Sequence, residues 1–305
     1  MTAEADRWPS LQPATWAETC ATLHMWSQVV GKVRLALAPP ENHWWHVALY
    51  VTARGLTTSP IPYRGGAFEI AFDFIEHRLT IDTSEGGRKV IALTPQTVAE
   101  FYRLVMAALS DLGIDVRIWP MPVEVPSPIR FDRDTQHGAY DARAANQFWR
   151  ALVEIAAVLR VFRGRFIGKS SPVHFFWGSF DLAVTRFNGR RTDVKAGADR
   201  MTREAYSHEV TSAGFWPGAA PAMDAVFYAY AVPEPPGYKA APAGPAAAFY
   251  SADLGEFVLK YDDVRTSSSP GDTLLDFLQS TYEAGAGLAK WNRAELEAPA
   301  LRGGG

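Results

Sequence analysis

The sequence has one cysteine, no long apolar run and no concentrated stretch of basic residues. The single Cys20 excludes an internal disulfide and is typical of a reducing compartment. No apolar run is long enough to span a bilayer, and the first ten residues lack the basic and then apolar pattern of a signal peptide. We therefore expect a cytoplasmic protein without a membrane partner.

Positive charge is also scarce, since the formal net charge is −3 at pH 7. A protein that follows a nucleic-acid backbone needs a basic surface to neutralise the phosphates. We therefore expect no nucleic-acid partner and predict a small-molecule ligand or substrate instead. The sequence leaves the oligomeric state open.

Apolar residues are plentiful, at 48% of the 305 residues, and 21% are charged, which is typical of a globular protein with a sizeable core. The chain has 10 Trp and 17 Phe. These aromatic residues favour either a well-filled core or a pocket for a flat, partly apolar ligand. Both interpretations stay open.

Hydrophobic periodicity predicts an α+β protein with mostly antiparallel sheets and flanking helices. We expect one unit over residues 8–297, with flexible termini at 1–7 and 298–305. The predicted helices cover 15–30, 95–112, 141–162 and 270–291. The predicted strands cover 33–37, 44–54, 68–74, 79–82, 89–93, 114–119, 172–186, 205–212 (or a short helix ending at Ser207), 227–232 and 256–261.

The order of elements and one short motif indicate an internal repeat over 15–119 and 141–291. The pattern W-x4-L-x-V-T begins at Trp44 and again at Trp177, and each follows a helix expected to end in Gly-Lys. A duplication predicts two pseudo-symmetric halves with a pocket between them. Its lining would include His46, Tyr50, Arg54, Ser179 and Asp181. The alternative is an ordinary sheet with one solvated face.

The segment 172–186 carries more polar groups than a strand built only for packing. Polar groups need hydrogen-bond partners once they are buried, so this segment marks the candidate site. As one continuous strand, it places Ser179 and Asp181 on one face. His174 and Arg186 fall on the other face unless Gly178 hosts a bulge.

A second polar cluster spans 204–209, and the aromatic segment 214–218, read as a rigid turn, follows it. As a strand, the cluster places Tyr206 and His208 on one face and Glu209 on the other. Histidine beside carboxylates favours acid–base chemistry near neutral pH. The alternative is a salt-bridged surface strand.

Three metal and nucleotide motifs are absent. His43 and His46 point to opposite faces if they lie on a strand, and His208-Glu209 lacks the second histidine of H-E-x-x-H. The segment 164–170 has the wrong glycine spacing for a phosphate-binding loop. No cofactor is therefore indicated, although a divalent metal held by His46, His174 and His208 stays an open alternative.

The leading hypothesis is an enzyme that acts on a small polar metabolite. Arg54 and Arg186 would hold an anionic group of that metabolite. The alternatives are a non-catalytic small-ligand or metal-binding protein and a structural or interaction protein. The candidate catalytic residues are His46, His174, Asp181, His208 and Glu209. The candidate ligand-binding residues are Trp45, Tyr50, Arg54, Trp177, Ser179, Arg186 and Tyr206.

Long motifs also carry a family resemblance. They include Asn42-His-Trp-Trp-His46, Tyr50-Val-Thr-Ala-Arg-Gly-Leu-Thr-Thr-Ser-Pro60, Ser171-Pro-Val-His-Phe-Phe-Trp-Gly-Ser-Phe-Asp-Leu-Ala-Val-Thr-Arg186, Arg203-Glu-Ala-Tyr-Ser-His-Glu209 and Gly214-Phe-Trp-Pro-Gly218. With these motifs, residues 8–297 resemble the bacterial domain-of-unknown-function family 5996. The resemblance implies one continuous unit and no particular reaction, cofactor or catalytic residue.

Overall fold

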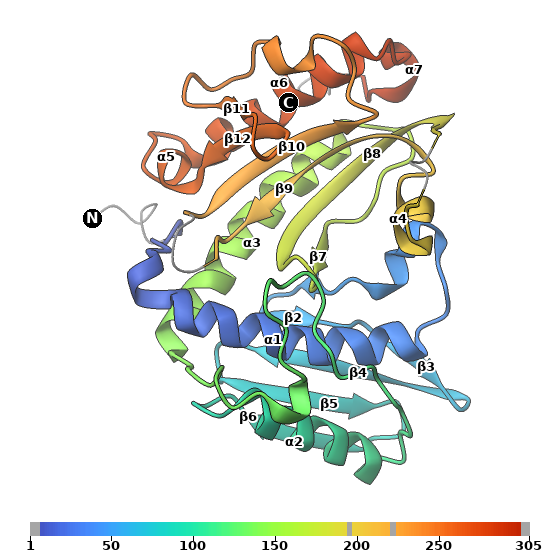
Figure 1. Cartoon of the computed structure of the whole chain (residues 1–305), viewed down its shortest axis with the longest axis vertical. Helices are drawn as coiled ribbons and strands as arrows, with labels where there is room; N and C mark the ends of the chain where they lie inside the picture. The colour runs from blue at the N-terminus through green and yellow to red at the C-terminus, as the bar shows by residue number, and fades with distance from the viewer. Residues whose placement is uncertain (1–6, 194–196, 220–223, 300–305) are drawn as a thin grey trace, which may run out of the picture.

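The computed structural model of the chain describes residues 7–193, 197–219 and 224–299. It contains two antiparallel sheets of six strands each, with helices packed against them (Figure 1). The α+β prediction is therefore confirmed. The termini predicted to be flexible, 1–7 and 298–305, lie almost entirely outside the described residues.

The first sheet lies between two helices in the chain. It has the order β1-β2-β4-β5-β6, with β3 paired to β4. The elements are α1 (Pro13–Leu37), the 3-10 helix η1 (Asn42–Val47), β1 (Tyr50–Val51), β2 (Gly55–Thr57), β3 (Ile61–Tyr63), β4 (Gly66–Asp73), β5 (Arg78–Thr83), β6 (Arg88–Ala92) and α2 (Val98–Asp111).

The second sheet has the order β11-β12-β10-β9-β8-β7. Its elements follow the short η2 (Phe131–Arg133) and begin with α3 (Ala142–Gly164). They continue with β7 (His174–Phe176), β8 (Asp181–Arg191), α4 (Arg200–Ala205), β9 (His208–Trp216), β10 (Val226–Val232), η3 (Tyr238–Ala240), β11 (Phe249–Ser251), β12 (Glu256–Lys260), α5 (Tyr261–Arg265), α6 (Pro270–Leu288) and α7 (Arg293–Leu296).

One backbone bridge joins the edges of the two sheets. Leu49 and Phe175 exchange two N–H···O hydrogen bonds of 2.8 Å. Both halves run from a long helix through six strands to another helix, but the strands are ordered differently in the two sheets. The internal repeat therefore stays a prediction.

The long helices α3 and α6 cover one face of the second sheet. The strand β10 shows the alternation, because Phe227, Ala229 and Ala231 are buried while Tyr228 and Tyr230 are half-buried. The buried face packs against α3 and α6, which run along the back of this sheet (Figure 1). The tyrosine face carries polar side chains and forms the floor of the candidate site.

The predicted helix end at Gly31 and the predicted strand 33–37 are wrong, because α1 continues to Leu37. Gly31 is needed for a close contact, since a Cβ there would lie 2.3 Å from the Trp177 ring. The helix ends instead before Pro39, where Ala38 is extended, as a residue preceding proline prefers.

Four predicted elements have a different form. The segment 44–54 begins in the 3-10 helix η1, which ends at Val47, and only Tyr50–Val51 is a strand, while 114–119 forms no strand. The segment 172–186 is a hairpin of β7 and β8 with a turn at 177–180, not one strand. The predicted strand 205–212 is present from His208 onward, and the alternative short helix is also present as α4 but ends at Ala205. The predicted turn 214–218 begins inside β9.

Candidate functional site

A cavity of about 760 Å³ lies over the open face of the second sheet. We call it the acidic pocket. Its walls come from η1, β7 to β10, α4, the start of β12 and the connector after α2. The lining residues are His43, Trp44, Trp45, Val47, Glu124, Phe176, Ser179, Asp181, Ala183, Thr185, Phe187, Asp199, Met201, Thr202, Ala205, Tyr206, Val210, Ser212, Trp216, Val226, Tyr228, Tyr230, Leu254 and Glu256.

Asp181 is the most deeply buried carboxyl of the pocket, with 6% of its surface exposed. It accepts hydrogen bonds from the hydroxyls of Ser179 and Tyr228. Burial raises the pKa of Asp181 above its ordinary value, and the two hydroxyl donors oppose that rise. The pocket floor therefore holds a carboxyl whose charge is costly and whose position is held by two donors.

A glycine lets Tyr228 reach that carboxyl. Tyr228 on β10 pairs with Gly214 on β9, and Gly214 pairs with Ala183 on β8. A Cβ at Gly214 would lie 2.5 Å from the Tyr228 hydroxyl and 2.5 Å from the carbonyl of Leu182. The tyrosine ring therefore crosses β9 over the bare backbone at Gly214.

Two further carboxyls face the same cavity from other elements. Burial raises the pKa of Glu256, at the start of β12, to about 7, and the charge of Asp181 adds to the rise. Glu124, in the connector after α2, has its pKa raised by the same two causes. The pocket therefore brings together three carboxyls, and the charge of Asp181 disfavours the charged forms of the other two.

Aromatic rings and hydroxyls complete the floor. The rings of Tyr228 and Tyr230 stack 6.1 Å apart at 12°. The Tyr230 hydroxyl lies 2.9 Å from that of Tyr206, and the hydroxyls of Thr185 and Ser212 are also 2.9 Å apart. These groups offer both apolar surface and hydrogen bonds to a ligand.

His43 lies at the η1 side of the pocket. Its Nδ1 is 3.0 Å from the carbonyl of Glu204, and the Nζ of Lys169 donates to its Nε2 over 2.7 Å. The ammonium of Lys169 also lies 5.3 Å from the Trp45 ring centre. Burial lowers the pKa of His43, and the Lys169 charge lowers it further. His43 is therefore a neutral acceptor that orients Lys169.

The pocket brings together four of the residues nominated from the sequence: Trp45, Ser179, Asp181 and Tyr206. The expected shared face of Ser179 and Asp181 fits their direct hydrogen bond. The other nominated residues lie elsewhere, and their functional roles stay predictions.

His174 lies behind the pocket wall and is fully buried. It pairs with Ala183, so it shares a face with Asp181, contrary to the single-strand prediction. The Tyr50 hydroxyl is 3.4 Å from its Nε2, and its Nδ1 has no described partner. Burial lowers the pKa of His174 to about 3, which keeps the ring neutral.

His46 and His208 are also separate from the pocket lining. The Nδ1 of His46 accepts a 3.1 Å hydrogen bond from the backbone N–H of Glu41. His208 lies 3.0 Å from the Ser207 hydroxyl through its Nδ1. The described residues contain no group of three or more His, Cys, Asp or Glu arranged to hold a metal ion.

Glu209 faces away from the pocket. It follows His208 directly in β9, so the two side chains lie on opposite faces of the strand, as predicted. Its carboxylate accepts hydrogen bonds from Asn188 (2.7 Å), Arg190 (2.6 Å) and Trp291 (3.2 Å). It lines a separate groove of about 440 Å³ between the second sheet and α6.

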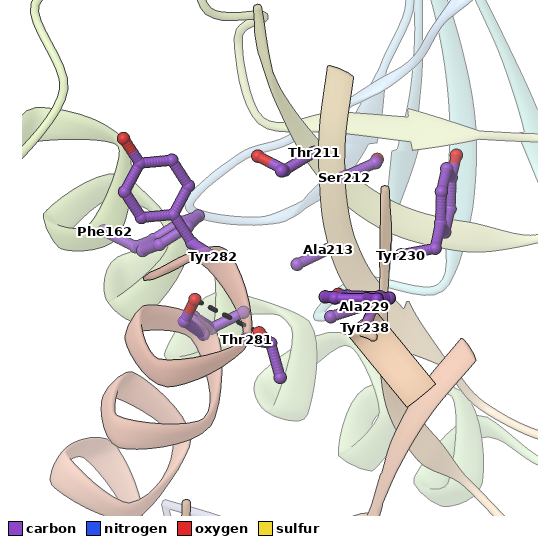
Figure 2. Close-up of a pocket in the computed structure, with 10 residues that line it drawn as sticks. Phe162, Thr211, Ser212, Ala213, Ala229, Tyr230, Tyr238, Thr281 and Tyr282 are labelled. Atoms are coloured by element: carbon purple, nitrogen blue, oxygen red, sulfur yellow. Dashed lines mark hydrogen bonds between the residues drawn. The ribbon is translucent and has the colours of Figure 1, made fainter. Parts of the chain in front are cut away.

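Arg186 points to the helix-covered face of the second sheet. Its guanidinium lies 3.4 Å from the Phe162 ring centre and 4.2 Å from that of Tyr282. Figure 2 shows these two rings on one side of the strands and Tyr230 on the other. The small cavity there, about 10 Å³, has room for about one water. Gly178 lies in the turn before β8, and Arg186 stays on the face opposite Asp181, as expected without a bulge.

Arg54 and Trp177 have structural contacts of their own. The Arg54 guanidinium is half-exposed and pairs over 2.8 Å with Asp73 at the end of β4. The Trp177 ring is buried, and its Nε1 donates a 2.7 Å hydrogen bond to the carbonyl of Val47.

Sequence reasoning missed several pocket residues. A signal existed for Tyr228 and Tyr230, because they alternate with buried apolar residues in a predicted strand. No signal marked Glu124, which follows a proline-rich turn and has a positive φ of 57°. A strand over this segment would point His43 and His46 to opposite faces, whereas both lie in the 3-10 helix η1.

Fold and geometry define an α+β protein with two antiparallel sheets and one acidic, aromatic cavity. The chain matches the model of a family of unknown function, DUF5996, over residues 8–298. It belongs to this family, which confirms the resemblance of its motifs. No curated protein and no solved structure matches the chain.

The helices of the described ranges were also compared with the length and hydropathy of membrane spans. None of them is both long and apolar enough to cross a bilayer.

Proposed function

We propose that this chain is an enzyme that acts on a small polar metabolite in the acidic pocket. The observation that carries the proposal is the buried Asp181 carboxyl at the floor of a 760 Å³ cavity, held by Ser179 and Tyr228. A cavity of this size, with apolar walls and a few convergent polar groups, suits a small molecule.

Glu256 supports acid–base chemistry in that pocket. A general acid or base works best when its pKa is close to the operating pH, and the pKa of Glu256 is raised to about 7. Asp181 would position the substrate through its fixed carboxyl, while Glu256 would transfer a proton. Substrate positioning requires a carboxyl that is held in place, as Asp181 is. Proton transfer requires a carboxyl whose pKa is close to neutral pH, as that of Glu256 is.

The test is a panel of small metabolites screened by thermal shift, followed by mass spectrometry of each stabilising mixture. We expect at least one compound to stabilise the protein and to be converted. Asp181→Asn should abolish both effects. The matched control is Asp263→Asn, which removes an exposed carboxyl on α5 outside the pocket. Equal turnover by both variants would contradict the proposal, and binding without conversion would identify a non-catalytic binding protein.

A further inference from the structure

The charges around the acidic pocket are one-sided. Four carboxyl residues are among its described lining residues, and none of those lining residues is lysine or arginine. The carboxyls come from separate parts of the chain: Glu124, Asp181, Asp199 and Glu256. Folding therefore gathers negative charge in one cavity instead of pairing it.

Two of these carboxyls lack partners. The side-chain carboxyls of Glu124 and Glu256 have no hydrogen bond or ion pair to any residue in the described ranges, although Asp181 acts on both electrostatically. Asp199 differs, because it caps α4 by accepting from the backbone N–H of Thr202. The unpartnered pair at the cavity wall is therefore available to a ligand.

The aromatic rings favour the same kind of ligand. The faces of Trp and Tyr rings are electron-rich and attract cations. Trp45, Phe176, Trp216, Tyr228 and Tyr230 all line the cavity and keep part of their surface exposed. Rings and carboxylates together form the usual surroundings of an organic ammonium group.

Arg200 on α4 borders the pocket, with its guanidinium 5.7 Å from the Trp44 ring centre. Lys169 borders the pocket at the His43 side. It contacts His43 and the ring of Phe187, and Phe187 is six residues from Asp181 along β8. Six residues of strand span about 20 Å. The ammonium of Lys169 therefore lies far from Asp181, and none of the described lining residues supplies a positive charge there.

From the cavity, its unpaired carboxyls and its exposed rings, we infer that the ligand of the acidic pocket is an organic amine or ammonium compound with an apolar or aromatic body. This inference rests on the proposed function and specifies its substrate class. The ammonium group would lie among Glu124, Asp181 and Glu256, with its body against the tyrosine rings of β10.

Binding of such a cation should release protons from the pocket carboxyls to the solvent. The carboxyls that face the ligand have raised pKa values, so a cation that binds their charged forms displaces protons to solvent. The other titratable groups on the pocket wall are His43, Asp199, Tyr206, Tyr228 and Tyr230. The tyrosines have raised pKa values and stay neutral, so they add no charge at neutral pH.

The test is calorimetric titration of the full chain with 2-phenylethylammonium and with its uncharged counterpart 2-phenylethanol, plus glucose as a neutral polyol. We expect the cation to bind about tenfold more tightly than the alcohol. Its affinity should rise between about pH 6 and pH 8, with proton release measured in buffers of different ionisation enthalpy.

The variant Glu124→Gln/Glu256→Gln should remove most of the preference for the cation and the proton release, while it leaves the weak binding of the alcohol. Neither carboxyl has a hydrogen-bond partner, so the variant should fold. Glu283→Gln, an exposed carboxyl on α6, is the matched control and should keep the preference.

Three results would overturn the inference: equal affinity for the ammonium and the alcohol, binding of glucose alone, or cation binding unchanged in the double variant. Each of these leaves the proposed function standing if the metabolite panel yields a converted compound. A panel without any stabilising compound would instead remove the proposed function.

Discussion

The hydroxyl of Tyr228 donates a hydrogen bond to the carboxyl of Asp181 across an intervening strand. The bond joins β10 to β8, and the ring passes over Gly214 on β9. Because Gly214 has no side chain, Tyr228 on β10 can reach Asp181 on β8. The pocket floor depends on this contact, and so do the expectations that follow.

Gly214→Ala should damage the floor without changing its charge. The added Cβ would meet both the Tyr228 ring and the backbone carbonyl of Leu182, and the carbonyl cannot move cheaply. We expect a loss of about 1–3 kcal/mol in unfolding free energy and a loss of ligand binding, measured by denaturant titration and thermal shift.

Gly189→Ala is a suitable comparison for this change. No atom lies within 4 Å of its added Cβ, although its positive φ of 93° carries a backbone cost of its own. It should lower stability and keep ligand binding. Ligand binding retained by Gly214→Ala would show that the crossing of Tyr228 is unimportant.

Glu256→Gln should change how stability depends on pH. The pKa of Glu256 is raised from 4.5 to about 7 in the folded chain, so between these values the folded state binds more protons than the unfolded state. Stability contributed by this group therefore falls as the pH rises from about 4.5 to 7. The variant should be more stable than the wild type at about pH 8, by about 1 kcal/mol after allowance for partial exposure.

Denaturant titrations at a series of pH values measure the effect of Glu256→Gln. The matched control is Glu283→Gln, which removes an exposed carboxyl on α6 that pairs with Arg293 outside the pocket. A wild-type advantage at about pH 8 would mean that the charge of Glu256 is stabilised by groups not identified at the pocket wall.

His174→Phe should make the protein less sensitive to acid. Burial lowers the pKa of His174 from 6.5 to about 3, so the unfolded state binds more protons between these values. Wild-type stability from this group is present above about pH 6.5 and lost as the pH falls toward 3. Phenylalanine keeps the ring contacts with Trp45 and Phe176 and removes the unpartnered Nδ1.

The measurement for His174→Phe is the slope of unfolding free energy against pH between about pH 6.5 and 4. His24, whose pKa burial lowers to about 4, will keep part of that slope. An unchanged slope would show that His174 accepts a proton in the folded state. Loss of turnover in a fully folded variant would support the catalytic role predicted for this histidine.

The sequence predicted the regular parts of the fold well. The helix begun by Asp141 is present as α3, and Asp141 caps it by accepting from the backbone N–H of Ala144. Alternation also predicted β4, β5, β6, β10 and β12 close to their observed bounds. Helix capping and hydrophobic periodicity depend on residues close together in the chain, so both can be predicted from a single sequence.

The candidate site was predicted only in part, because its geometry depends on chain reversals. Phe180 has a positive φ of 60°, unusual for a bulky residue, and no local pattern announced the turn before β8. That turn brings His174 onto the face of Asp181. Glu124 and Glu256 come to Asp181 from distant parts of the chain, and such convergence is decided by tertiary packing.

The most direct test of the account locates a bound ligand. Hydrogen–deuterium exchange, measured with and without a compound that stabilises the protein, reports which backbone amides it protects. We expect protection in η1, β8, β9 and β10 around Asp181, and loss of that protection in Asp181→Asn. Protection confined to the groove beside Glu209, or no change around Asp181, would contradict the claim that the acidic pocket is the functional site.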